Sequence, residues 1–173
     1  MANTKTNTLK LVELAILTAL VILLQSIGQI IPALGTAGNF VLVPIALGAI
    51  MLGKKAGAWL GFVCGAVVLI FGAIGKDAFT HILFEMHPII TALICIVKTT
   101  VAGFLAGLVY RLLSRKNELI AVLVAAAVVP VTNTGLFICG CFLILDAIKA
   151  AQTAFGDSSN VISFIIYGLA LAN

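Results

Sequence analysis

The chain has 173 residues, of which 62% are hydrophobic and only 9% are charged, and its formal net charge is +4. A soluble domain carries about 25% charged residues, and a small one leaves a large part of its surface in water. The composition therefore excludes a soluble enzyme, a disordered tail and a disulfide-stapled secreted module. We predict an all-α integral membrane protein.

Six apolar segments are candidates for membrane-spanning helices, each of which needs about 20 mostly apolar residues. Their expected bounds are 11–31, 40–53, 56–74, 88–110, 119–145 and 161–172. We treat residues 1–173 as one transmembrane domain. The second segment is short and contains Pro44. The sixth would rise only about 18 Å, so it either stops inside the bilayer or lacks its C-terminal end.

The basic residues orient the six predicted helices. With a cytoplasmic N-terminus, seven of the ten lie on the cytoplasmic side: Lys5, Lys10, Lys54, Lys55, Arg111, Arg115 and Lys116. Lys76 and Lys149 then fall in the polar stretches 75–87 and 146–160, which we expect to be outer loops. Because cytoplasmic loops are enriched in Lys and Arg, we predict this topology.

Small residues recur at every fourth position on three of the predicted helices. They are Gly57, Gly61 and Gly65, then Gly103 and Gly107, and on the first helix Ala15 and Ala19. Helices in lipid associate through such residues, which allow close approach. We interpret the glycines as packing contacts within the chain. For Ala15 and Ala19, internal packing and docking onto another membrane protein are both open.

Lys98 lies about ten residues into the predicted helix 88–110, roughly 15 Å below its outer boundary. A charged ammonium group is costly at this depth, so the side chain should face the bundle interior or a water-filled cavity and have a partner. One interpretation is a structural pairing or snorkelling. The other is recognition of a carboxylate or phosphate in a cavity that opens to the outside.

Two polar clusters lie within other predicted helices. The sequence Pro-Val-Thr-Asn-Thr-Gly at 130–135 places neutral hydrogen-bonding groups at membrane depth, after a proline that can kink the helix. We favour a binding role for Asn133, beside Thr132, because polar groups in lipid usually face one another or a ligand. The alternative is that Asn133 bridges helices. Gln25 and Gln29 form the second cluster, near the outer end of the first helix.

The polar stretch 75–87 contains His81, Glu85 and His87, which are side chains that could bind zinc. The pattern is not HExxH, and spacing places no third ligand. A role in loop structure or in a lid is favoured over a metal site. The sequence has no nucleophile elbow, phosphate loop or paired intramembrane carboxylates. We therefore expect no catalytic residue, no metal and no cofactor.

As a set, these segments resemble the S components of energy-coupling factor (ECF) transporters, which are small six-helix proteins that bind one vitamin or related micronutrient. The resemblance covers nearly the whole chain. It rests on Ala-Ile-Leu-Thr-Ala at 15–19, Val-Pro-Ile at 43–45, Gly-Lys-Lys-Ala-Gly-Ala at 53–58 and Thr-Asn-Thr at 132–134.

The resemblance implies a high-affinity pocket near the outer face of a multi-pass protein in the bacterial cytoplasmic membrane. Loops that close this pocket would include Asn39 in one loop and His81 and Glu85 in another, which completes the candidate binding set. A membrane coupling subunit and two cytoplasmic ATPases would supply energy, with Ala15 and Ala19 docking on the coupling subunit. No nucleic-acid partner is implied.

The Thr-Asn-Thr element is most similar to the pantothenate/riboflavin-type branch, and Lys98 suits a carboxylate, so pantothenate is the expected substrate. Riboflavin, folate, pyridoxine and queuosine precursors are alternatives.

Two other classes of protein compete with this prediction. A small homo-oligomeric channel or exporter would place the glycine stripes between identical subunits. An intramembrane enzyme would use His81, Glu85 and His87 and would bind metal.

Overall fold

The computed structural model describes residues 2–30, 40–156 and 160–165, and within these ranges all regular structure is helical. The side chains of residues 2–7, 29 and 30 are not described. The helices are α1 (Ala2–Ile30), α2 (Leu42–Met51), α3 (Lys54–Ala73), α4 (Ala78–Met86), α5 (Pro88–Leu113), α6 (Glu118–Leu143), α7 (Leu145–Ala154) and α8 (Val161–Ser163). The predicted all-α class is confirmed.

Four of the described helices are long and apolar enough to cross a membrane. They are Thr8–Gly28 within α1, Lys54–Ala73, Pro88–Leu113 and Glu118–Leu143. Helix α2 is apolar but has only 10 residues. At 1.5 Å per residue it rises about 15 Å, roughly half of a hydrocarbon core. Pro44 lies in its first turn, where a missing N–H costs little, and therefore does not break the helix.

The expectation of outer loops at 75–87 and 146–160 was wrong in part, because these stretches contain α4 and α7. Both helices bury one side and expose the other. In α7 the buried residues include Ala147, Ile148 and Ala151, a spacing that places them on one helical face. Of the expected helix 161–172, α8 forms the start, and residues 166–172 lie outside the described part.

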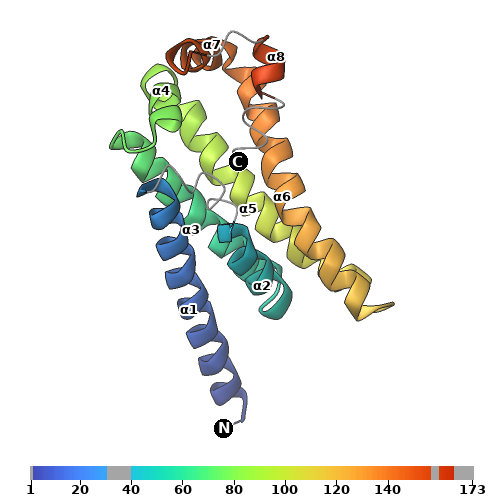
Figure 1. Ribbon diagram of the computed structural model, residues 1–173. Helices are drawn as coiled ribbons and strands as arrows, with labels where there is room; N and C mark the ends of the chain where they lie inside the picture. The colour runs from blue at the N-terminus through green and yellow to red at the C-terminus, as the bar shows by residue number, and fades with distance from the viewer. Residues whose placement is uncertain (1, 31–39, 157–159, 166–173) are drawn as a thin grey trace.

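Helix α5 is central, because it packs against α3 on one side and α6 on another (Figure 1). The contact with α3 brings two backbones together. A Cβ atom added at Gly57, Gly61 or Gly65 would overlap the backbone carbonyl groups of Gly103, Thr99 or Cys95, respectively. The glycine stripes are therefore packing contacts within one chain, as predicted. These contacts contradict the channel alternative, which places the same glycines at an interface between identical subunits.

The two ends of the bundle differ in charge. Helices α4, α7 and α8 gather at one end, whereas the connections α2–α3 and α5–α6 lie towards the other (Figure 1). The α2–α3 connection turns at Gly53, whose φ of +94° is in the region that favours glycine. It is followed by Lys54 and Lys55, and the α5–α6 connection contains Arg115 and Lys116. Basic residues thus concentrate at the end away from α4 and α7.

Candidate functional site

The buried core consists of two apolar clusters, and we call the upper cluster the one with residues of α4, α7 and α8, the helices at the top of Figure 1. The lower cluster comprises Val21, Val41, Leu42, Ile45, Ala46, Ala49, Leu60, Cys64, Ala102, Ala106 and Val129. The upper cluster comprises Leu83, Ile94, Phe137, Cys141, Ile144, Ala147, Ile148, Ala151, Phe164 and Ile165. Along α5 and α6, the stretches between the two clusters include the buried polar residues Lys98, Thr99 and Asn133.

This boundary contains buried polar side chains from three helices: Gln25 on α1, Lys98 and Thr99 on α5, and Asn133 on α6. On α5, Lys98 lies between Ile94 of the upper cluster and Ala102 of the lower one. On α6, Asn133 lies one turn from Phe137 above and one turn from Val129 below. Gln25 on α1 follows Val21 of the lower cluster by one turn. We call Gln25, Lys98 and Asn133 the buried polar layer.

Lys98 is 6% exposed, and its Nζ atom lies 4.3 Å from the centroid of the Phe137 ring on α6. An ammonium group over an aromatic face is stabilised by the ring quadrupole, and more so where water is excluded. The thiols of Cys64, Cys95 and Cys141 lie within electrostatic range of the same ammonium group. The structure therefore buries the Lys98 amino group against the Phe137 ring of α6.

Asn133 is 3% exposed, and its Oδ1 atom is buried without a hydrogen-bond partner among the described residues. Leaving a buried acceptor unpaired costs about 1–3 kcal/mol, and native proteins contain few such atoms. Asn133 and Phe137 are four residues apart and share a face of α6. The amide oxygen thus lies on the same side of α6 as the ring that Lys98 contacts, and it can accept a hydrogen bond there.

Gln25 is 5% exposed and accepts a hydrogen bond from Cys64, with 3.5 Å between Oε1 and Sγ. This contact joins α1 to α3 beside the layer. The structure therefore brings three of the sequence-predicted residues, Gln25, Lys98 and Asn133, to one level of the bundle. The sequence analysis did not predict a role for Phe137. Its position four residues after Asn133 indicated that the two side chains share a face of one helix.

Thr132 does not join the layer. It lines a shallow groove of about 340 Å³ on the outer surface of α6, with Leu123, Val124, Ala127, Val128 and Val131. Consecutive helical residues point about 100° apart, so Thr132 and Asn133 face different surroundings. Asn39 lies outside the described residues, as does the side chain of Gln29.

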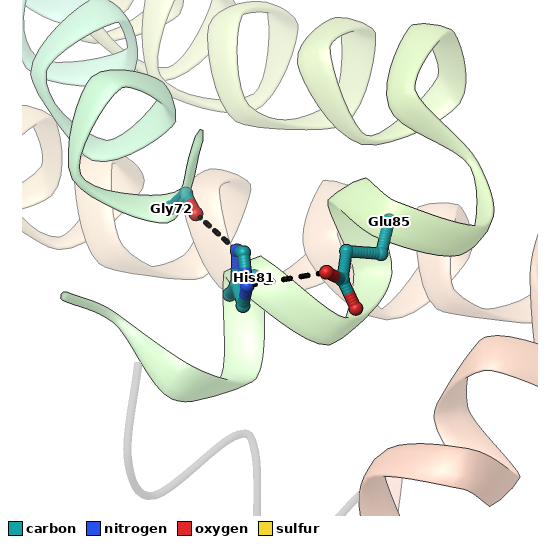
Figure 2. Close-up of polar contacts among 3 residues, drawn as sticks. All are labelled: Gly72, His81 and Glu85. Atoms are coloured by element: carbon teal, nitrogen blue, oxygen red, sulfur yellow. Dashed lines mark hydrogen bonds and ion pairs between the residues drawn. The ribbon is translucent and has the colours of Figure 1, made fainter. Parts of the chain in front are cut away.

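His81 and Glu85 lie on α4, away from the layer, and His81 holds α4 to the end of α3. The His81 Nδ1 atom donates to the Gly72 carbonyl oxygen over 3.0 Å, and its Nε2 atom lies 3.4 Å from Glu85 Oε1 (Figure 2). His87 Nε2 lies 3.7 Å from Asp146 Oδ2 at the start of α7. In the described part of the chain, no group of three potential metal-binding side chains lies together.

Ala15 and Ala19 are both exposed on α1. Their large apolar neighbours on the same helix, including Ile16 and Leu20, are exposed as well. The small residues of α1 thus lie on an apolar surface, whereas the glycines of α3 are buried against α5.

Four spanning-length helices with apolar outer surfaces, around a buried polar layer, define a helical membrane protein with an internal polar site. The sequence model of the ECF transporter, substrate-specific component family matches residues 9–173, and the chain belongs to this family. No curated protein and no solved structure shows significant similarity to the chain. Members of this family are substrate-binding subunits of transporters, not enzymes, so the intramembrane-enzyme alternative is wrong.

Proposed function

We propose that this substrate-specific component binds one vitamin or related micronutrient with high affinity at the buried polar layer. The observation that carries the proposal is the unpaired Oδ1 atom of Asn133, one turn along α6 from the Phe137 ring that Lys98 contacts. Polar and charged residues inside a membrane protein are costly, and they usually mark a substrate pathway or binding site. A bound solute that donates to Asn133 removes the cost of the unpaired oxygen.

The proposed topology has six membrane-spanning helices with the N-terminus inside, in the bacterial cytoplasmic membrane. Support comes from the basic residues of the α2–α3 and α5–α6 connections, which lie towards the same end of the bundle, away from α4 and α7 (Figure 1). In this topology α4 and α7 cap the outer end of the bundle. His81 and Glu85 then belong to the cap, and we propose that Asn39 and Gln29 contact the substrate from the outer side.

Pantothenate is the first substrate to test. It carries a carboxylate for Lys98, and it has hydroxyl and amide N–H donors for the Asn133 oxygen. Riboflavin, folate, pyridoxine and queuosine precursors complete the set of candidate substrates.

The chain contains no nucleotide-binding motif, so we propose that energy comes from a membrane coupling subunit and two cytoplasmic ATPases. Ala15 and Ala19 are the proposed contact with the coupling subunit. Their exposure on an apolar face of α1 supports this role, because small residues allow a partner helix to approach closely.

Native mass spectrometry of the detergent-purified chain tests the proposed function. We expect one vitamin-sized molecule per chain, and saturable binding of one member of the panel after the bound molecule has been removed. Vesicles that contain the chain alone should bind this vitamin without accumulating it. Accumulation against a gradient by the chain alone would contradict the proposal.

A further inference from the structure

The end of the bundle with the α2–α3 and α5–α6 connections carries positive charge that the chain does not balance. The basic residues of these connections and of the adjoining helix ends are Lys54, Lys55, Arg111, Arg115 and Lys116, which we call the basic cluster. Within the described part of the chain, both ion pairs join a histidine to a carboxylate at the opposite end (Figure 1). Neither Glu13 nor Glu118, where the structure describes them, pairs with the basic cluster. A partner or the solvent must therefore supply the opposite charge.

The packing of α3 against α5 brings three of these basic residues together. A Cβ atom added at Gly107 would overlap the backbone of Lys54, so α5 touches α3 at its first residue. Arg111 lies four residues after Gly107, about 6 Å further along the same face of α5. Lys54 also places its Nζ atom 5.3 Å from the centroid of the Phe104 ring on α5. Lys54, Lys55 and Arg111 thus surround one junction of the two helices.

An exposed aromatic stripe continues from this junction along α3. Trp59 lies one turn after Lys55 on the same face, and its side chain is 50% exposed. Its ring stacks with that of Phe62, with 6.0 Å between the ring centroids. Tryptophan is enriched where the hydrocarbon core of a membrane meets the headgroups. A cation, a tryptophan and a phenylalanine therefore follow one another in the order of headgroup, interface and acyl chain.

This order of groups fits a phospholipid better than it fits an acidic protein segment. Lysine and arginine at a membrane surface attract anionic lipids, and each contributes about fivefold in affinity. An acidic protein segment would balance the cations, but it would leave the adjacent aromatic rings of α3 without an apolar neighbour. A lipid supplies both a phosphate and an acyl chain.

We propose that the junction of α3 and α5 binds an anionic phospholipid. The phosphate pairs with the exposed cations Lys55 and Arg111, and an acyl chain lies along Trp59 and Phe62. In the proposed topology this lipid belongs to the cytoplasmic leaflet. The inference concerns a surface outside the buried polar layer and does not depend on which substrate the layer binds.

Trp59 is the only tryptophan in the chain, so its fluorescence reports on the lipid beside the proposed site. The full-length chain is reconstituted into phosphatidylcholine vesicles that contain increasing fractions of a lipid with brominated acyl chains, which quench tryptophan at short range. The brominated lipid is either phosphatidylglycerol or phosphatidylcholine. We expect brominated phosphatidylglycerol to quench with an apparent affinity about fivefold higher or more. Salt at about 1 M, where the Debye length is about 3 Å, should weaken this preference.

Two double variants that remove the same charge locate the effect. Lys55→Gln combined with Arg111→Gln should lower the preference for phosphatidylglycerol about fivefold or more. Lys76→Gln combined with Lys149→Gln is the control, because it removes two exposed lysines at the opposite end and should leave the preference unchanged. Trp59 is retained in both double variants.

Three results would overturn the inference. Equal quenching of the unaltered chain by the two brominated lipids would leave an acidic protein surface as the partner of the basic cluster. A preference that persists without Lys55 and Arg111 would place the lipid elsewhere. An equal loss of preference in both double variants would show that net charge, rather than this junction, selects the lipid.

Discussion

Two neighbouring faces of α5 pack in different ways. Towards α3, the contact is backbone to backbone, and Gly61 lies directly against the Thr99 carbonyl group. Towards α6, the contact includes a charged side chain, an aromatic ring and an unpaired amide oxygen. The first face leaves no room for a ligand and makes α3 and α5 a scaffold. The second face contains groups that a polar ligand can bind, and the proposed substrate site lies on this side.

The largest expected effect comes from adding bulk to the scaffold face. Gly61→Leu would force a side chain into the Thr99 backbone, and overpacking of this kind costs about 3 kcal/mol or more. We expect loss of the folded protein, measured as a collapse of the monodisperse peak in fluorescence-detected size-exclusion chromatography. Gly135→Leu is the control, because nothing lies within 4 Å of a Cβ atom added there. Equal profiles for the two variants would contradict the assignment of this face.

The second prediction concerns α1, whose small residues are exposed rather than buried. Replacing both Ala15 and Ala19 with leucine should abolish uptake by the assembled transporter, because bulk prevents close helix approach. Ligand affinity of the isolated chain should be unchanged. Uptake of radiolabelled vitamin in cells that express the complete transporter measures this effect. Ala126→Leu on the exposed side of α6 is the control, and normal uptake by the double variant would count against docking at α1.

A third prediction separates stability from binding at Asn133. Asn133→Leu removes the unpaired oxygen and should raise the stability of the ligand-free protein by about 1 kcal/mol. The same change should reduce ligand affinity about tenfold or more. Thermal unfolding of the ligand-free protein and calorimetric titration give the two values.

Thr99→Val is the control for Asn133→Leu. The Thr99 hydroxyl is also buried, but it already donates to the Cys95 carbonyl oxygen over 3.1 Å. Its removal should lower stability slightly. A similar decrease for Asn133→Leu would mean that the Asn133 oxygen is paired in the ligand-free protein.

The smallest effect is expected at the cap. His81→Leu removes the hydrogen bond from His81 Nδ1 to the Gly72 carbonyl oxygen, which contributes about 1 kcal/mol. The melting temperature should fall by a few degrees, with ligand affinity nearly unchanged. Glu85→Gln should have a still smaller effect, because the side chain is 68% exposed and surface ion pairs contribute little. A large loss of affinity in His81→Leu would instead assign the residue to the binding site.

The sequence was sufficient for features that depend on local pattern. Long apolar segments predicted the four helices of spanning length among the six expected, and glycines at every fourth position predicted the contact of α3 with α5, because close approach needs small residues. The burial of Lys98 followed from the cost of a charge in lipid. These inferences need only the chemistry of one segment and its solvent.

Features that depend on how two segments meet could not be predicted in the same way. The contact of Lys98 with Phe137 requires the register of α5 against α6, which no local pattern specifies. Helix α7 was missed because its charged residues obscured the apolar face at 147, 148 and 151. The different surroundings of Thr132 and Asn133 were predictable from helix geometry, because adjacent helical residues point in different directions.

The central claim is that the substrate binds between α5 and α6 at the buried polar layer. Its most direct test is equilibrium binding of the vitamin panel to the chain with Lys98→Met and Asn133→Leu combined, compared with the unaltered chain. We predict a folded double variant that has lost saturable binding of the vitamin that the unaltered chain retains. Undiminished affinity in the folded double variant would contradict the claim.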